Sequence, residues 1–91
     1  MQVMYKVRVS GRVQGVFFRG STRQQAIKYR VSGYAKNLPD GSVEILLAGD
    51  VRDVDHILAW ISAGGPPAAS VAHVGVQQIT TEQQIRGFIT G

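Results

Sequence analysis

Residues 34–62, YAKNLPDGSVEILLAGDVRDVDHILAWIS, decide the fold of this chain. Residues 34–38 and 42–48 favour two short strands, with Pro39-Asp40-Gly41 between them. Proline presets the first turn position, aspartate bonds to nearby backbone and glycine accepts positive φ, so the segment predicts a hairpin. A helix should follow, with Asp50 as its N-cap and two glycines beyond its end. The spacing predicts an apolar face made of Val51, Val54, Ile57, Leu58 and Ile61.

The segment before this hairpin predicts one strand and one helix. Residues 3–10 alternate between apolar and polar side chains, which is typical of a half-buried strand. Residues 21–31 predict a helix that ends near Gly33 and leaves Ile27 outside its apolar stripe. That stripe contains Thr22, Ala26 and Tyr29.

The segment after the second helix predicts a strand at residues 70–78 and a short edge strand at residues 87–90. The order of elements is then strand, helix, strand, strand, helix, strand. Because the strands alternate apolar and polar residues, both helices should cover the same face of the sheet. We therefore expect a single α+β domain over residues 1–91. Its expected architecture is a ferredoxin-like βαββαβ sandwich, with two helices on one face of a mainly antiparallel, four- to five-stranded sheet.

Composition restricts the classes of protein that this chain can belong to. It has 91 residues, 44% of them hydrophobic, which is enough for one small core and argues against disorder. It has no cysteine, so a disulfide framework and a thiolate zinc site are both excluded. No apolar run is long enough to be a signal peptide or a membrane span, and we expect a cytoplasmic protein.

Positive charge is concentrated in the first part of the chain. The formal net charge is +4, and eight lysines and arginines precede the first acidic residue, Asp40. Such a region attracts anionic ligands, which include nucleic acids and phosphorylated metabolites, although solubility alone would also explain it.

The segment 11–19, GRVQGVFFR, is a candidate anion-binding loop. It contains two glycines and no proline, so every position offers an amide N–H and the chain can turn several of them toward one point. Arg19 follows at the predicted start of a helix, and its planar guanidinium suits two phosphate oxygens. The segment lacks the spacing of a Walker A motif and of a dinucleotide-binding fingerprint. A plain glycine-containing connection would also explain the pattern.

Other candidate residues are weaker. Asn37 lies near a strand end, where its amide could hold a water, although a role in the turn would also explain it. His56 and His73 have no matched carboxylate or second ligand, and the aspartates near residue 50 suit helix capping rather than a metal. The aromatic side chains expected to serve in core or loop packing are Phe17, Phe18, Tyr34 and Trp60.

Two segments resemble the signatures of the acylphosphatase family. VSGRVQGVFFR matches the first signature at every fixed position, and GYAKNLPDGSV followed by Gly49 resembles the second. The likeness covers nearly the whole chain, except that the ending at residues 87–91, GFITG, departs from the family's usual last strand.

The resemblance implies a metal-independent hydrolase of acyl phosphates that needs no cofactor. It implies that Arg19 binds the phosphate, that Asn37 positions the attacking water, and that the amides of Gln14, Gly15, Val16, Phe17 and Phe18 cradle the phosphate. Acyl phosphates and inorganic phosphate are then the expected partners, with no nucleic acid and no membrane, and we expect a monomer.

Two other functions share this predicted architecture. An RNA-recognition-like module has the same fold, but it would carry aromatic residues on its two central strands, where this chain offers only Tyr5. An acylphosphatase-like domain of a larger carbamoyl-transfer enzyme is the second alternative. The length of the chain and its lack of zinc-finger cysteines favour a stand-alone enzyme instead.

Overall fold

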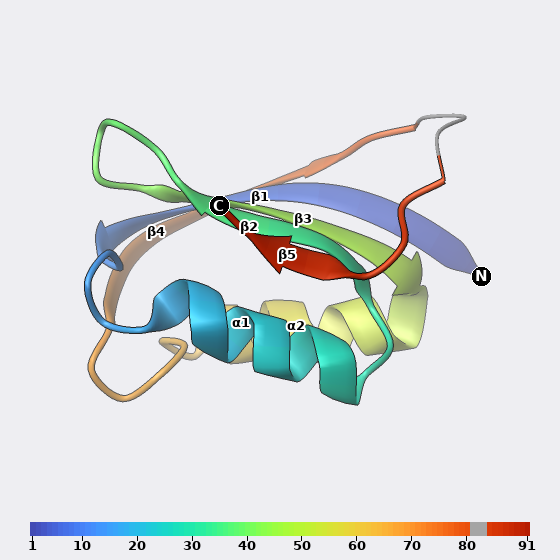
Figure 1. The fold of residues 1–91 in the computed structure, drawn as a ribbon, viewed down its shortest axis with the longest axis horizontal. Helices are drawn as coiled ribbons and strands as arrows, with labels where there is room; N and C mark the ends of the chain where they lie inside the picture. Colours follow the sequence, from blue (N-terminus) through green and yellow to red (C-terminus); the bar gives the residue numbers. More distant parts are fainter. Residues whose placement is uncertain (81–83) are drawn as a thin grey trace.

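The computed structural model describes residues 1–80 and 84–91. A five-stranded sheet with strand order β4-β1-β3-β2-β5 lies against two helices, and both helices cover the same face of the sheet (Figure 1). Neighbouring strands are antiparallel except for β2 and β5, which are parallel. The elements are β1 (Gln2–Arg12), α1 (Phe18–Lys28), β2 (Ser32–Asn37), β3 (Val43–Asp50), α2 (Val51–Ser62), β4 (Ser70–Gln78) and β5 (Phe88–Thr90). The predicted α+β sandwich is confirmed.

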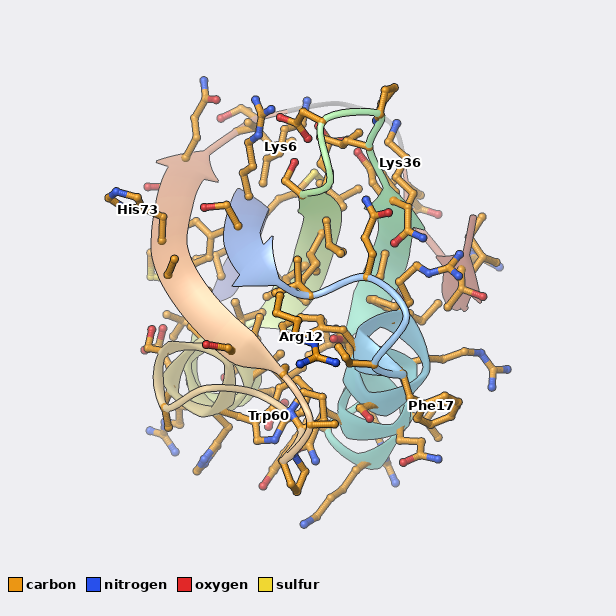
Figure 2. The ribbon with its side chains drawn as sticks, turned by 90° about the vertical axis from the view of Figure 1, so that its left-hand side faces the viewer. Lys6, Arg12, Phe17, Lys36, Trp60 and His73 are labelled. Atoms are coloured by element: carbon orange, nitrogen blue, oxygen red, sulfur yellow. The ribbon has the colours of Figure 1, made fainter. Side chains whose placement is uncertain are left out.

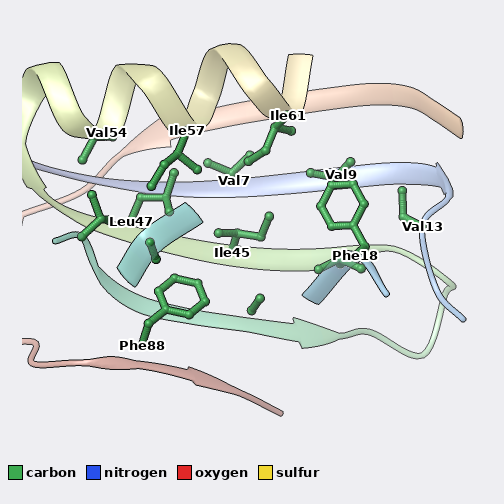
Figure 3. Packing of buried hydrophobic residues seen from close by; sticks show 14 of the residues in the cluster. Val7, Val9, Val13, Phe18, Ile45, Leu47, Val54, Ile57, Ile61 and Phe88 are labelled. Atoms are coloured by element: carbon green, nitrogen blue, oxygen red, sulfur yellow. The ribbon is translucent and has the colours of Figure 1, made fainter. Parts of the chain in front are cut away.

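The core lies between the sheet and the two helices. Val7 and Val9 of β1 and Ile45 and Leu47 of β3 are fully buried there (Figure 3). The helix α2 supplies three further buried side chains, Val54, Ile57 and Ile61, as its spacing predicted, and Val51 and Leu58 pack partly buried beside them. Burial of each such side chain contributes about 1.5–3 kcal/mol to stability, which holds the sheet and helices in fixed positions.

The start of α2 is also as predicted. The side chain of Asp50 accepts a hydrogen bond from the amide of Arg52 at 3.0 Å, which satisfies one of the free N–H groups at the helix start. This hydrogen bond is the largest cause that lowers the pKa of the Asp50 carboxyl, and the chain's terminal ammonium lowers it further.

The bounds of α1 differ from the prediction. The helix begins at Phe18, three residues before the predicted start, because Phe17 takes the left-handed conformation (φ 61°, ψ 27°) and turns the chain into the helix. It ends at Lys28, because Arg30 also takes a positive φ of 56° at a position where glycine is usual. The predicted faces are nevertheless correct: Thr22 and Ala26 are buried, whereas Ile27 is 57% exposed.

The sheet brings three distant segments to one end of the molecule. Since β1 and β2 both run antiparallel to β3, their carboxyl ends lie at the same end, and β5 runs parallel to β2. The β1–α1 loop, the β2–β3 hairpin and the end of β5 therefore meet there, at the end of the molecule that faces the viewer in Figure 2. In the part of the chain that the structure describes, no helix is long and apolar enough to cross a membrane.

Candidate active site

The β1–α1 loop has the backbone of an anion-binding turn. Gly15 (φ 75°) and Phe17 (φ 61°) both have positive φ, with one residue between them. Left-handed residues interspersed in this way turn successive amide N–H groups toward a common point. The first turn of α1 follows at once, and its N-cap, Phe17, contributes no side-chain hydrogen bond to it. The free amides and the positive end of the helix dipole therefore face the same region.

Arg19 lies in the first turn of α1, half-buried beside this loop. Its guanidinium donates a hydrogen bond to the main-chain oxygen of Gly91, which fixes one edge of the planar group. A cavity of about 310 Å³ adjoins it, with Gly15, Phe17 and Thr90 among its lining residues. One arginine, several loop amides and the end of β5 thus surround a single opening.

Asn37 is the last residue of β2 and pairs with Val43 of β3. The amide of Gly91 donates to the carbonyl of Ala35 at 2.9 Å, two residues before Asn37. Gly91 therefore contacts both Arg19 and β2, the strand that ends at Asn37. Asn37 is exposed at the end of the sheet that also carries the loop, but it does not line the cavity itself.

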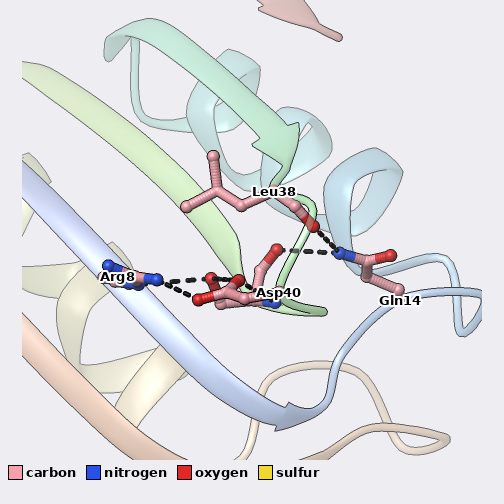
Figure 4. Close-up of polar contacts among 5 residues, drawn as sticks. Arg8, Gln14, Leu38 and Asp40 are labelled. Carbon is pink, nitrogen blue, oxygen red and sulfur yellow. Dashed lines mark hydrogen bonds and ion pairs between the residues drawn. The ribbon is translucent and has the colours of Figure 1, made fainter.

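Gln14 connects the loop to the hairpin through its side chain. Its Nε2 donates to the carbonyl oxygens of Leu38 and Ser42, each at 2.9 Å, so both hydrogens of the amide are used (Figure 4). The family resemblance implies only a backbone role for Gln14, and no local sequence pattern indicates this side-chain contact. The bridge fixes the distance between the loop and the strand end that carries Asn37.

The hairpin has a second set of polar contacts at its turn. The Asp40 carboxylate accepts from the hydroxyl and the amide of Ser42 and also pairs with the guanidinium of Arg8 (Figure 4). The hydrogen bonds from Ser42, and then the pair with Arg8, lower the pKa of Asp40 to about 2. Because the pKa of Asp40 is lower in the folded protein than in the unfolded chain, the ionised carboxylate stabilises the fold at neutral pH. This stabilisation is lost as pH falls toward 2 and the carboxylate becomes protonated.

The predicted loop residues fall into separate groups in the structure. Gly15, Phe17, Phe18 and Arg19 line the cavity, whereas Gln14 and Val16 do not. Phe18 is only 1% exposed and packs against Trp60, with ring centroids 5.9 Å apart, so its predicted role in packing is confirmed. Phe17, which was also expected to pack, is 66% exposed.

The two histidines and the acidic residues do not add to this site. His56 is exposed on α2 and stacks on Tyr29 with ring centroids 4.9 Å apart, and neither His56 nor His73 lines the cavity beside Arg19. Within residues 1–80 and 84–91, no group of three or more histidine, aspartate or glutamate side chains is arranged to hold a metal ion.

Replacing Gln14 by glutamate should weaken both stability and turnover. The carboxylate cannot donate, and it would face two carbonyl oxygens, so we expect the free energy of unfolding to fall by ~2–3 kcal/mol. A displaced hairpin should also lower turnover by ~10-fold or more. Urea unfolding and steady-state kinetics measure the two effects. The control is Gln24→Glu on the exposed face of α1, and a Gln14→Glu protein that matches this control in both measurements would contradict the bridge.

The fold and the site together define a ferredoxin-like α+β protein with an arginine and loop amides around a cavity at one end of its sheet. The acylphosphatase family model matches residues 5–90. The chain therefore belongs to the acylphosphatase family.

Individual relatives agree with this assignment. An acylphosphatase of Colwellia psychrerythraea is 47% identical over 83 residues, which cover 91% of this chain and 92% of the relative. An acylphosphatase of Chromohalobacter salexigens is 53% identical over 73 residues, 80% of each chain. The solved acylphosphatase of Coxiella burnetii superimposes with a TM-score of 0.90 at 36% identity, over 99% of this chain and 93% of that one. These relatives support acylphosphatase function and do not favour the RNA-recognition-like alternative.

Proposed function

We propose that this acylphosphatase cleaves the carboxyl–phosphate bond of acyl phosphates by direct attack of water, without a metal ion, and releases a carboxylate and inorganic phosphate. The observation that carries the proposal is the position of Arg19 beside the left-handed loop and the cavity. A guanidinium and several amides at one opening suit a group with three charged or partly charged oxygens.

The chemistry of the substrate explains why so few groups suffice. A carboxylate is a good leaving group, so the enzyme needs neither a covalent nucleophile nor a strong acid. It must stabilise charge on the phosphoryl oxygens and hold a water in line with the bond that breaks. We assign the first task to Arg19 and to the amides of Gly15, Val16, Phe17 and Phe18, because these amides lie in the loop and the first turn of α1. We assign the same task to the backbone amide of Gln14, which lies at the start of the loop.

We assign the second task to Asn37. Its side-chain amide can accept a hydrogen bond from water and donate one to a phosphoryl oxygen. The water oxygen forms a bond to phosphorus as the phosphorus–oxygen bond to the acyl group breaks, and the acyl oxygen keeps the electron pair. An asparagine is too weak a base to remove the proton, so a phosphoryl or carboxyl oxygen of the substrate accepts it. The Gln14 bridge supports this assignment, because it holds the hairpin against the loop.

We also propose that the enzyme acts as a monomer in the cytoplasm. The monomer is supported by the cavity, which residues of one chain form without a second copy, and by the similarity to a small single-domain acylphosphatase from Coxiella burnetii.

Activity should survive exhaustive chelation. We expect hydrolysis of benzoyl phosphate at an undiminished rate after dialysis against EDTA, because the proposed reaction uses an arginine, an asparagine and backbone amides only. Phenyl phosphate, an unactivated ester, should be hydrolysed at least ~10²-fold more slowly, since its leaving group is poorer. The measurement is release of inorganic phosphate from both compounds with and without chelator. Loss of activity that added Mg²⁺ or Zn²⁺ restores would contradict the metal-free mechanism.

A further inference from the structure

Phe17 has two unusual properties in one residue. Its side chain is 66% exposed, although aromatic side chains are usually covered, and its backbone is left-handed at φ 61° and ψ 27°. A bulky L-residue in this conformation costs free energy, and such strain is typical of functional sites. Phe17 does not belong to the buried core, so core packing does not explain why a phenylalanine stands here.

The ring of Phe17 is placed beside the cavity by Gly20. A Cβ atom at Gly20 would lie 2.5–3.0 Å from three carbons of the ring, so the missing side chain at position 20 leaves the space that the ring fills. Figure 2 shows Phe17 at the loop end of α1, projecting outward from the molecule. The ring thus lies over the first turn of α1, and Phe17 and Arg19 line the same cavity.

Phe17 is the apolar wall of this cavity that remains free for a ligand. Two other apolar residues of its lining, Val13 and Phe18, are each only 1% exposed, because the core covers them. When Arg19 and the loop amides hold a phosphoryl group, the rest of the substrate extends toward solvent from the cavity. The exposed apolar surface that it can meet at this opening is the Phe17 ring.

We propose that Phe17 determines substrate specificity by packing its ring against the acyl group, so that the enzyme prefers acyl phosphates with an aromatic or bulky apolar acyl group over those with a small one. This inference rests on the proposed function, because it assumes that Arg19 holds the phosphoryl group. An aromatic ring that packs on a second ring gains both buried area and favourable ring geometry, which acetyl and carbamoyl groups cannot supply.

The test compares benzoyl phosphate with acetyl phosphate in matched variants. Phe17→Asn removes the ring but keeps the loop, because asparagine tolerates the left-handed conformation. We expect the ratio of kcat/KM for benzoyl phosphate to kcat/KM for acetyl phosphate to fall by ~5–10-fold. Phe17→Tyr keeps the ring and should hold the ratio within about twofold of the original protein. Ile27→Ala, which removes an exposed apolar side chain from α1 outside the cavity, controls for apolar surface in general.

The ratio of the two kcat/KM values tests the role of Phe17, whereas the rates themselves test whether the protein hydrolyses acyl phosphates. If Phe17→Asn lowers both rates by the same factor, the ring only shapes the loop and the inference is overturned. An equal fall of the ratio in Phe17→Tyr and Phe17→Asn would overturn it too. If the original protein hydrolyses neither compound, the proposed function itself fails and the inference fails with it. Circular dichroism establishes that each variant is folded. For a folded variant too slow to assay, calorimetry measures the affinities for phenylphosphonate and for inorganic phosphate, and Phe17→Asn should weaken the first more than the second.

Discussion

Replacement of Arg19 by lysine is expected to reduce turnover of benzoyl phosphate by at least ~10²-fold and to weaken inhibition by inorganic phosphate at the same time. Lysine keeps the positive charge but has no planar pair of donors. In the structure one part of the guanidinium already donates to the main-chain oxygen of Gly91. No other side-chain hydrogen bond of Arg19 is present within residues 1–80 and 84–91, so its remaining N–H groups can bind a phosphoryl group. The ammonium group of a lysine side chain has no such planar set of donors, so it cannot hold Gly91 and a phosphoryl group at the same time in the geometry that arginine provides.

The measurements are kcat, KM and the inhibition constant for phosphate, and the matched control is Arg23→Lys. Arg23 follows one turn later on α1, and its Nε donates to the carbonyl of Phe88 in β5, the strand that Gly91 follows. It does not line the cavity, so its replacement should leave turnover unchanged. An Arg19→Lys protein within threefold of the original would show that Arg19 is only a loop residue.

Asn37→Ala should separate catalysis from phosphate binding. We expect turnover to fall on the order of 10²-fold or more, because the water loses the group that orients it. The inhibition constant for inorganic phosphate should stay nearly the same, since the loop and Arg19 are unchanged. Stability should also change little, because Asn37 is exposed at the end of β2.

The two constants must be measured on the same folded Asn37→Ala protein. If both change together, Asn37 contributes to the phosphate cradle, and the division of tasks proposed above is wrong. If neither changes, Asn37 serves the turn, and another group orients the water. Rapid quenching of a single turnover should detect no phosphoenzyme in either protein, because water is the proposed nucleophile.

The parts of the fold that depend on local pattern could be predicted from the sequence. The alternation of residues 3–10, the Pro39-Asp40-Gly41 turn and the Asp50 cap all follow from nearest neighbours in the chain, and the structure contains each of them. The start of α1 could not be found in this way. Sequence rules look for a capping side chain or proline there, whereas this helix starts from a strained phenylalanine.

The hydrogen bonds that connect the parts of the site could not be predicted from the local sequence pattern either. The Gln14 bridge joins residues 24 and 28 positions apart, and the contact of Arg19 with Gly91 spans 72 positions. Local propensity contains no information on such pairs. The family resemblance suggested which residues should act, but only the sheet order shows how the loop, the hairpin and β5 reach one end of the molecule.

The strand order also has a consequence for how the protein acquires its activity during folding. The first strand to leave the ribosome, β1, has no neighbour close in sequence: Gln2 pairs with Asp50, and Tyr5 pairs with Gln78. Closing such long loops costs entropy before the contacts repay it, and topologies of this kind fold slowly. The loop and the hairpin cannot meet until β3 lies between β1 and β2, and Arg19 gains its main-chain partner only when β5 has docked. We therefore expect turnover to appear only after β5 has docked, because the contact with Gly91 joins Arg19 to the residue that follows β5.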